Sequence, residues 1–251
     1  METDLRHALD RHELELYYQP KIHLASGKIA GIEALIRWNH PEKGLISPDA
    51  FIPLAEETGL ILPIGKWVIQ EACRQTRAWQ KAGMTDLQVS VNVSTQQVQP
   101  YTLMESIVGA LTESGLASES LVVELTESMA MDDPELKIEL LNKIKASGVC
   151  FSVDDFGTGY SSLSYLQRLP ITELKIDRSF IIDLPDNKDG GAIVSAIVAM
   201  AHSLGLKVVA EGIETQAQLD FMRTVNCDII QGYFYSKPLN KKDFEIYAAT
   251  L

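Results

Sequence analysis

The sequence predicts an α/β fold, a modified TIM-type (βα)₈ barrel made by a single domain that spans residues 1–251. Three observations predict it. Eight strand-like runs are separated for the most part by amphipathic helix-like stretches, the pattern of parallel strands joined by crossover helices. The length of 251 residues fits one barrel. No linker or low-complexity segment divides the chain.

The strand-like runs are short and apolar, as barrel strands are. Only the segment ASGK, residues 25–28, joins the first two runs. So short a connection makes a hairpin, whereas a parallel crossover needs a dozen residues or more. We therefore expect one strand near the N-terminus to run antiparallel to the rest. The eight runs are residues 14–24, 28–38, 87–94, 121–127, 150–156, 173–180, 206–212 and 228–235.

Five stretches are predicted to be helices, because their apolar residues recur at helical spacing and their ends carry typical terminal residues. The stretch 134–148, for example, starts at Pro134, a favourable first helical position, and ends at Gly148. The five predicted helices are residues 66–83, 103–115, 134–148, 191–205 and 215–225.

The composition limits the class of function. The chain has 22 Lys and Arg against 34 Asp and Glu, a net charge of −12, which argues against binding of DNA or RNA polymers and against contact with anionic membranes. Its three widely spaced cysteines and its charged N-terminus favour a soluble, cytoplasmic chain. Its five histidines show no metal-ligand spacing, and no serine-hydrolase, zincin, P-loop or dinucleotide motif occurs.

Acidic and amide side chains stand near the C-terminal ends of successive strand-like runs. Catalytic groups of (βα)₈ barrels come from this end of the strands, so we expect these side chains to converge on one site. Buried charges are rare unless they are paired or coordinate an ion. Carboxylate and amide oxygens suit hard cations such as Mg²⁺ and Mn²⁺. The six candidate ligands are Glu33, Asn92, Glu124, Asp154, Asp155 and Glu211.

The adjacent pair Asp154 and Asp155 is the sharpest local signal. Two neighbouring carboxylates repel each other unless cations or protons separate them. Because neighbouring side chains of a strand point to opposite faces, a strand end or a bulge is needed to bring both to one site. Gly-Thr-Gly at 157–159 then gives the freedom of a mobile loop. The alternative is a solvated turn with an aspartate helix cap.

The other candidates have plain structural alternatives when each is taken alone. Glu124 also fits a surface charge on an edge strand, and Asn92 fits a turn residue. Lys175 alternates with Leu174 and Ile176 and therefore faces away from them, toward solvent or toward the lumen of a barrel. Six coincidences at equivalent strand ends are needed to explain the whole set without a shared site, so we favour one site.

Oxygen ligands, one lysine and no histidine suit the hydrolysis of a phosphodiester. Two hard cations about 3.5–4 Å apart can bind a phosphate, activate water and stabilise the leaving oxygen. A lysine beside them can orient the water or neutralise charge in the transition state. On these grounds alone, metal-assisted proton abstraction of the enolase kind stays open as a competing chemistry.

The ordered motifs resemble the EAL-domain family of bacterial cyclic di-GMP phosphodiesterases. The resemblance runs from LELYYQPKI to QGYFYSKPL and includes EALIRW, FIPLAEETGLI, NVS, ELTES, DDFGTGYSSL, LKIDRSF and AEGIET. It implies a hydrolase that opens cyclic di-GMP to linear pGpG with two Mg²⁺ or Mn²⁺ ions. We expect Ca²⁺ to inhibit hydrolysis, because Ca²⁺ tolerates looser geometry and activates water poorly. The resemblance further implies a homodimer, and fusion to sensor or GGDEF domains in a parent protein that could be associated with the inner membrane.

The resemblance also assigns roles to residues. It implies that Asp154 bridges two ions, the first held with Glu33, Asn92 and Glu124, the second with Asp155 and Glu211. Lys175 is expected to contact the attacking water and to act with Asp154, Asp155 and Glu211 in catalysis. Glu127 in ELTES is expected to anchor the DDFGTG loop. The expected substrate contacts are Gln19, Leu35, Arg37, Pro53, Asp177 and Gln231.

Two other functions compete with an active phosphodiesterase. One is a catalytically silent receptor for cyclic di-GMP, and the other is a protein-interaction module that keeps only the fold. Silent relatives usually lose metal ligands, whereas this chain keeps a matching residue at every metal and lysine position. The sequence therefore favours the enzyme.

Overall fold

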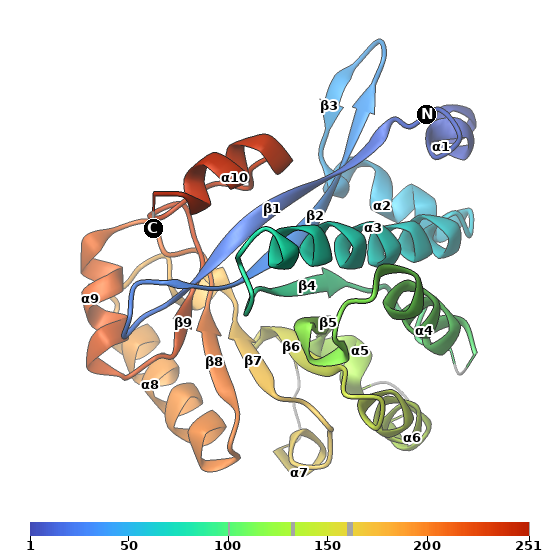
Figure 1. Ribbon diagram of the computed structural model, residues 1–251. Coiled ribbons are helices and arrows are strands. Elements are labelled where there is room, and N and C mark those ends of the chain that lie inside the picture. The colour runs from blue at the N-terminus through green and yellow to red at the C-terminus, as the bar shows by residue number, and fades with distance from the viewer. Residues whose placement is uncertain (100, 132–133, 160–162, 251) are drawn as a thin grey trace.

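The computed structural model describes residues 1–99, 101–131, 134–159 and 163–250, so residues 160–162 of the DDFGTGYSS motif lie outside the described part. Eight strands form a closed barrel in the order β1, β9, β8, β7, β6, β5, β4, β2, and pairing of β1 with β2 closes it. Helices surround the strands on the outside (Figure 1). The predicted barrel architecture is confirmed.

The structure gives the following bounds. The barrel strands are β1 (Leu14–His23), β2 (Ile29–His40), β4 (Gln88–Asn92), β5 (Leu121–Thr126), β6 (Cys150–Phe156), β7 (Glu173–Ile176), β8 (Lys207–Ala210) and β9 (Ile229–Ile230), and β3 (Gly44–Ile46) pairs with the outer end of β2. The helices are α1 (Glu2–Ala8), α2 (Pro48–Glu57), α3 (Ile61–Lys81), α4 (Thr102–Ser114), α5 (Glu127–Met131), α6 (Pro134–Lys145), α7 (Leu163–Leu166), α8 (Lys188–Ser203), α9 (Gln216–Thr224) and α10 (Lys241–Ala248).

Strand β1 runs against its two neighbours, whereas the other neighbouring strands of the barrel are parallel. β1 pairs antiparallel with β2 over most of its length and with β9 at His23 and Ile22. The pairing places Gln19 opposite Glu33. The short connection after β1 therefore makes a hairpin, as predicted. The β2–β3 extension and α1 project to one side of the barrel in Figure 1.

Two predicted strands end much earlier than expected, and others end one or two residues early. The run 173–180 is a strand only to Ile176, because the side chain of Asp177 then accepts a hydrogen bond from the backbone N–H of Ser179 and starts a 3₁₀ turn. The run 228–235 keeps only two strand residues. There the chain leaves the sheet at Gly232, whose φ of +159° and close approach to the backbone of Ile213 exclude a side chain.

Several short elements lie outside the predicted ranges, among them β3 and the helices α1, α2, α5, α7 and α10. In α2 the sequence carries Pro53 inside the helix, where proline has no N–H to donate and ordinarily ends a helix. α5 and α7 have only 5 and 4 residues, too few to show a helical period. The five predicted helices are present with ends shifted by a few residues.

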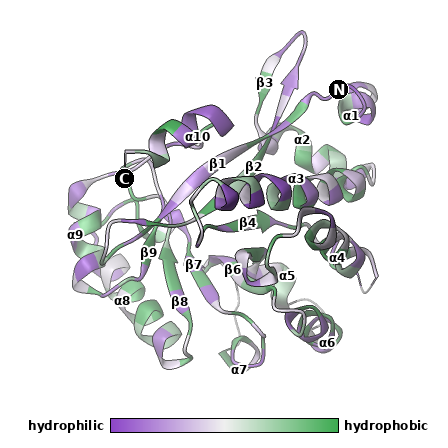
Figure 2. Ribbon diagram, viewed as in Figure 1, coloured by the Kyte–Doolittle hydropathy of each residue, from purple (hydrophilic) through white to green (hydrophobic). Residues whose placement is uncertain are grey.

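The hydrophobic core lies between the barrel and the helices. The longest described helix, α3, buries Ile64, Val68 and Ile69 against it, and Figure 2 shows hydrophobic residues along β8 and mixed polarity on the helices. Trp79 of α3 packs edge-on against Tyr18 of β1, with ring centroids 4.7 Å apart. Burial of each such side chain stabilises the fold by about 1.5–3 kcal/mol. Within the described residues, no helix combines the length and apolarity needed to cross a bilayer.

Candidate active site

Parallel pairing places the candidate residues at the same end of neighbouring strands. Asn92 of β4 pairs with Glu124 of β5, and Thr126 of β5 pairs with Asp154 of β6. Glu211 follows β8, and its backbone N–H donates to Ile176 at the end of β7. The carboxylates consequently meet at the C-terminal end of the strands, where a (βα)₈ barrel carries its catalytic groups.

Two groups of three carboxylates share Asp154. In each group, one oxygen from every residue lies within 4.8 Å of the others. The first group is Glu33, Glu124 and Asp154, and the second is Asp154, Asp155 and Glu211. The structure therefore brings together the carboxylates that the sequence predicted to converge, and Asp154 stands between the two groups.

A bulge at the end of β6 turns Asp155 into the site. The pairing of β6 with β7 shifts between Val153 and Phe156, and Asp155 has a φ of +54°. Aspartate tolerates this left-handed conformation better than most residues. The Asp155 N–H donates to Asp154 Oδ1 at 2.9 Å. The two neighbouring carboxylates thus contribute to one cluster although strand geometry would separate them.

Lys175 lies at the centre of the carboxylates. Its Nζ is 2.6 Å from Glu211 Oε1, 2.8 Å from Glu124 Oε2 and 2.9 Å from Asp154 Oδ2. A fourth carboxylate, that of Glu33, lies 3.6 Å away. The lysine side chain is 1% exposed, so it faces the lumen and not solvent.

Amide side chains hold the carboxylate of Glu33. Asn92 Nδ2 donates to Glu33 Oε1 at 2.7 Å, and Gln231 Nε2 donates to Glu33 Oε2 at 2.5 Å. Gln231 also donates to Gln19 Oε1 at 3.0 Å, which links β1 to the end of β9. Three residues predicted to contact metal or substrate are therefore joined in one network around Glu33.

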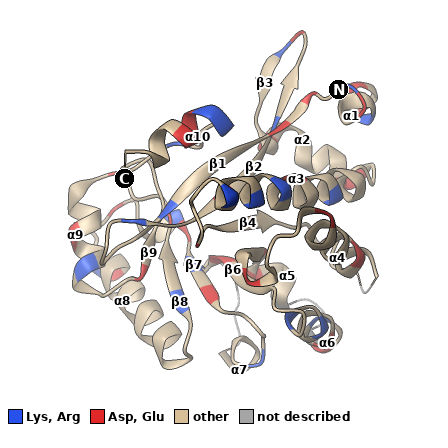
Figure 3. Cartoon of the chain, viewed as in Figure 1, with Lys and Arg blue, Asp and Glu red and all other residues tan. Residues whose placement is uncertain are grey.

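A second buried lysine lies one strand pleat deeper in the barrel. Lys21 Nζ is 2.7 Å from Glu124 Oε1, 2.7 Å from Ser90 Oγ and 3.2 Å from Glu173 Oε1. Ser90 and Glu173 precede Asn92 and Lys175 by two residues on their strands, so they face the same lumen. Figure 3 shows charged residues on the barrel strands as well as on the outer helices.

The surroundings of the acids shift their pKa values in opposite directions. Burial raises the pKa of Glu211 to about 8, with nearby Asp154 and Glu33 adding to the rise against the opposing charge of Lys175. Burial would also raise the pKa of Glu124, but the ammonium groups of Lys175 and Lys21 more than offset it and lower that pKa to about 2. Burial, then the charge of Asp154, raises the pKa of Asp155.

The charges of the cluster fit divalent cations. Six carboxylates face the two ammonium groups of Lys21 and Lys175, which leaves four negative charges if every acid is ionised. Like charges so close cannot all ionise without additional cations. Oxygen ligands without histidine or cysteine favour hard ions of the Mg²⁺ and Mn²⁺ type. Four positive charges are those of two divalent ions.

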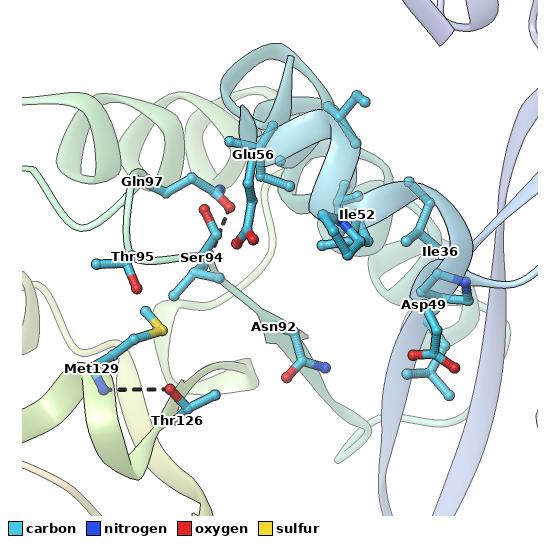
Figure 4. A pocket seen from close by; sticks show the side chains of 18 of the residues that line it. Ile36, Asp49, Ile52, Glu56, Asn92, Ser94, Thr95, Gln97, Thr126 and Met129 are labelled. Atoms are coloured by element: carbon cyan, nitrogen blue, oxygen red, sulfur yellow. Dashed lines mark hydrogen bonds between the residues drawn. The ribbon is translucent and has the colours of Figure 1, made fainter. Parts of the chain in front are cut away.

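Two pockets adjoin the cluster. One of about 220 Å³ lies directly over it and is lined by Gln19, Glu33, Asp154, Glu211 and Gln231 among others. The other, of about 530 Å³, lies between β2, α2, α3 and the segment after β4, and Figure 4 shows its side chains. Leu35 lines both pockets, which places them next to each other.

The remaining predicted substrate contacts are spread around these pockets. Pro53 lines the larger pocket from α2. Arg37 donates to the carbonyl oxygen of Ile36 at 2.9 Å, and its guanidinium lies 5.5 Å from the centroid of the Tyr17 ring. Among the described residues, Arg37 lines neither pocket. Asp177 caps the turn after β7, and its charge helps raise the pKa of Asp155.

Glu127 contacts the loop after β6. The residue begins α5 and is 2% exposed, and its Oε2 accepts hydrogen bonds from the backbone N–H groups of Gly157 at 2.7 Å and Gly159 at 3.4 Å. A Cβ on Gly159 would lie 2.9 Å from Glu127 Oε1, so the loop approaches the carboxylate as closely as glycine allows.

The deeper residues of the site, Lys21 and Glu173, were not predicted from the sequence. Glu173 lies two residues before the predicted Lys175, and Lys21 lies two residues after the predicted Gln19. The two-residue period of a strand was the available signal. Arg178 and Glu214, which line the smaller pocket and form an ion pair at 2.9 Å, were missed as well.

The fold is a barrel, and at the C-terminal ends of its strands lies a cluster of carboxylates that could hold metal ions. The family model of the EAL domain matches residues 2–238. The chain therefore belongs to the EAL domain family.

Similar proteins are known from Pseudomonas aeruginosa. The chain is 50% identical over 94% of its length to the bifunctional diguanylate cyclase/cyclic di-GMP phosphodiesterase MucR, and 47% identical over 95% to the cyclic di-GMP phosphodiesterase NbdA. It spans 34% and 30% of the lengths of these two relatives. A solved structure of the PaMucR phosphodiesterase in complex with c-di-GMP superposes with a TM-score of 0.93 at 49% identity, covering 96% of this chain and 98% of that one.

Proposed function

We propose that the chain is a metal-dependent phosphodiesterase that hydrolyses cyclic di-GMP to linear pGpG. The observation that carries the proposal is the pair of carboxylate groups sharing Asp154 around Lys175. Family membership and similarity to two named cyclic di-GMP phosphodiesterases support the substrate. A bound c-di-GMP in the similar PaMucR structure supports it as well.

Two Mg²⁺ or Mn²⁺ ions fit the two carboxylate groups. Glu33, Asn92, Glu124 and Asp154 would hold one ion, and Asp154, Asp155 and Glu211 the other. Bound there, the ions would supply Lewis-acid activation of water and of the scissile phosphate. This assignment uses the six oxygen-bearing residues that the sequence predicted, and it balances the excess negative charge of the cluster.

Lys175 and the amides supply what the protein itself contributes to the reaction. The ammonium group of Lys175, held by Glu124 and Asp154, can donate to the attacking water or to a phosphate oxygen. Water adds to phosphorus as the bond to the 3′ oxygen breaks, leaving a free 3′-hydroxyl and a 5′-phosphate. Gln19 and Gln231 position Glu33 and the floor of the smaller pocket.

The two adjoining pockets suit a substrate with two nucleoside arms. The phosphodiester would lie over the carboxylates in the smaller pocket, and an arm would extend past Leu35 into the larger one, where Pro53 lies. The larger pocket is mostly apolar with a few polar groups, as ligand pockets are. Arg37 and Asp177 remain candidate substrate contacts at the periphery, with Arg37 suited to a phosphate oxygen.

The direct test is incubation of the purified chain with cyclic di-GMP and Mg²⁺ or Mn²⁺, followed by chromatography of the products. We expect pGpG to accumulate. With Ca²⁺ alone we expect cyclic di-GMP to bind without turnover, because Ca²⁺ accepts looser geometry and activates water poorly. Binding without pGpG in any of the three metals would favour the silent receptor instead. Neither binding nor product would favour a module that interacts only with proteins.

We also propose that the chain is a single domain acting in the cytoplasm within a larger signalling protein, fused to sensor or GGDEF domains. The relatives in which this stretch is about a third of the length support the fusion.

A homodimer is the expected assembly. Exposed Leu136 of α6 and exposed Leu163 of α7 offer an apolar surface for it, and Glu135 of α6 pairs with Arg168 just after α7. Light scattering of the wild-type chain and of Leu136→Glu would test it.

A further inference from the structure

We propose that Lys21 is a positioning residue that fixes the orientation of the Glu124 carboxylate beneath the metal centre. The inference rests on the proposed metal-dependent function. It assigns a role to a side chain that belongs to none of the carboxylate groups and lines neither of the two pockets beside the cluster in the described structure.

Lys21 is held on three sides. A lysine ammonium has three N–H donors, and three acceptors surround this one: Glu124 Oε1 and Ser90 Oγ at 2.7 Å, and Glu173 Oε1 at 3.2 Å. The acceptors come from β5, β4 and β7, while Lys21 itself comes from β1. The ammonium therefore ties four strands together at one point inside the barrel.

The contact divides the two oxygens of Glu124 between two layers. Lys21 Nζ contacts Glu124 Oε1 at 2.7 Å. Lys175 Nζ, which also contacts Asp154, lies 2.8 Å from Glu124 Oε2. With Oε1 fixed, the carboxylate presents one oxygen to the carboxylate group it shares with Glu33 and Asp154. Partners behind a ligand commonly set its orientation in this way, and their loss costs about 10- to 100-fold in metal affinity or activity.

A purely stabilising role does not explain a lysine at this position. Burial of an ion pair costs desolvation, and well-packed apolar residues of similar volume often serve stability as well or better. Lys21 is 3% exposed and Glu173 is 8% exposed, and both lie in a lumen that other barrels fill with branched apolar side chains. The charge is therefore better explained by the ligand that it holds than by packing.

The experiment compares Mn²⁺ affinity by titration calorimetry in the wild-type chain, Lys21→Met and Glu173→Gln. We expect Lys21→Met to bind Mn²⁺ about 10- to 100-fold more weakly. Glu173→Gln is the comparison variant, because it removes a charge from the same network but leaves Lys21 on Glu124, and it should weaken Mn²⁺ binding less than Lys21→Met does. A crystal structure of Lys21→Met should show the Glu124 carboxylate rotated away from its wild-type position.

A second variant guards against misfolding. Lys21→Met leaves Glu173 without a cation, so the double variant Lys21→Met/Glu173→Gln removes that stranded charge and should show the same loss of affinity. Unchanged Mn²⁺ binding in either Lys21 variant would overturn the positioning role. Tighter binding would overturn it too, by showing that Lys21 acts as a competing positive charge.

The outcome is separable from that of the proposed function. If the wild-type chain binds Mn²⁺ but forms no pGpG, the proposed activity fails while the affinities still decide the role of Lys21. If the wild-type chain binds no Mn²⁺ at all, both proposals fall.

Discussion

The two buried lysines of the barrel lie one pleat apart and have opposite surroundings. Lys21 has three N–H donors and three acceptors, one of them a neutral hydroxyl, so its layer is satisfied. Lys175 has the same three donors but faces four carboxylates, with Asp155 beside them. In the lower layer, formed by Lys21, Ser90 and Glu173, donors and acceptors match. The upper layer, formed by Lys175 and the carboxylates around it, carries negative charge that only further cations can balance. The comparison teaches that a buried charge does not by itself indicate a reactive site. The better indicator is an excess of buried carboxylates over the ammonium groups that face them.

The largest effect is expected for Asp154→Asn, in the upper layer. Asp154 belongs to both carboxylate groups, so its loss weakens both at once. We expect the rate of cyclic di-GMP hydrolysis to fall by a factor on the order of 10³ or more. Asp220→Asn, on exposed α9, is the matched control and should leave the rate unchanged. Near-normal turnover in Asp154→Asn would refute the shared-ligand assignment.

The next effect separates the two lysines. Lys175→Met should lower kcat by about 10²–10³-fold, because a positioned donor to the reacting groups is lost. It should not weaken Mn²⁺ binding, since Lys175 competes with cations for the same carboxylates. Lys21→Met, by contrast, should weaken Mn²⁺ binding. Parallel kinetics and calorimetry decide the matter, and equal changes in both variants would erase the distinction between the layers.

A smaller effect is expected on the stability of the lower layer. Glu173→Gln removes one of the two carboxylates that balance Lys21 but leaves Glu124 in place. We expect the free energy of unfolding to fall by about 1–3 kcal/mol, the usual cost of weakening a buried charged hydrogen bond. Urea unfolding followed by circular dichroism measures it. No loss of stability would show that Glu173 is not a real partner of Lys21.

The smallest effect is expected at the surface. Arg168 and Glu135 form a two-bonded ion pair at 2.7 and 2.9 Å, with better geometry than the contact between Lys21 and Glu173. Both side chains are exposed, so water and salt screen the pair. Arg168→Ala should leave the urea midpoint unchanged. A shift as large as that of Glu173→Gln would mean that burial does not control the strength of these pairs.

Much of the upper layer was predictable from the sequence because its residues interrupt apolar runs. Glu33 lies in GIEAL and Asp154 ends FSV, where a charge demands a partner. The antiparallel strand was predictable from a loop too short for a crossover. The lower layer was not found, because Lys21 follows Pro20 in a polar stretch and Glu173 precedes its strand's apolar residues, so neither interrupts an apolar run.

Other features depend on how the chain packs. The sequence required a strand end or a bulge to bring Asp155 to the site, but the occurrence of a bulge and the left-handed backbone of Asp155 depend on pairing between β6 and β7. The larger pocket depends on α2, which continues through Pro53 where local rules end a helix. Whether Arg37 faces the substrate likewise depends on packing, since its guanidinium lies by the ring of Tyr17.

The central claim is that two metal ions lie among the carboxylates that share Asp154. Anomalous diffraction from crystals of the wild-type chain grown with Mn²⁺ tests it most directly. The surplus charge of the upper layer predicts two manganese peaks per chain, one among Glu33, Glu124 and Asp154 and the other among Asp154, Asp155 and Glu211. Manganese at other places, or Lys175 as the sole cation among these carboxylates at saturating Mn²⁺, would contradict the account.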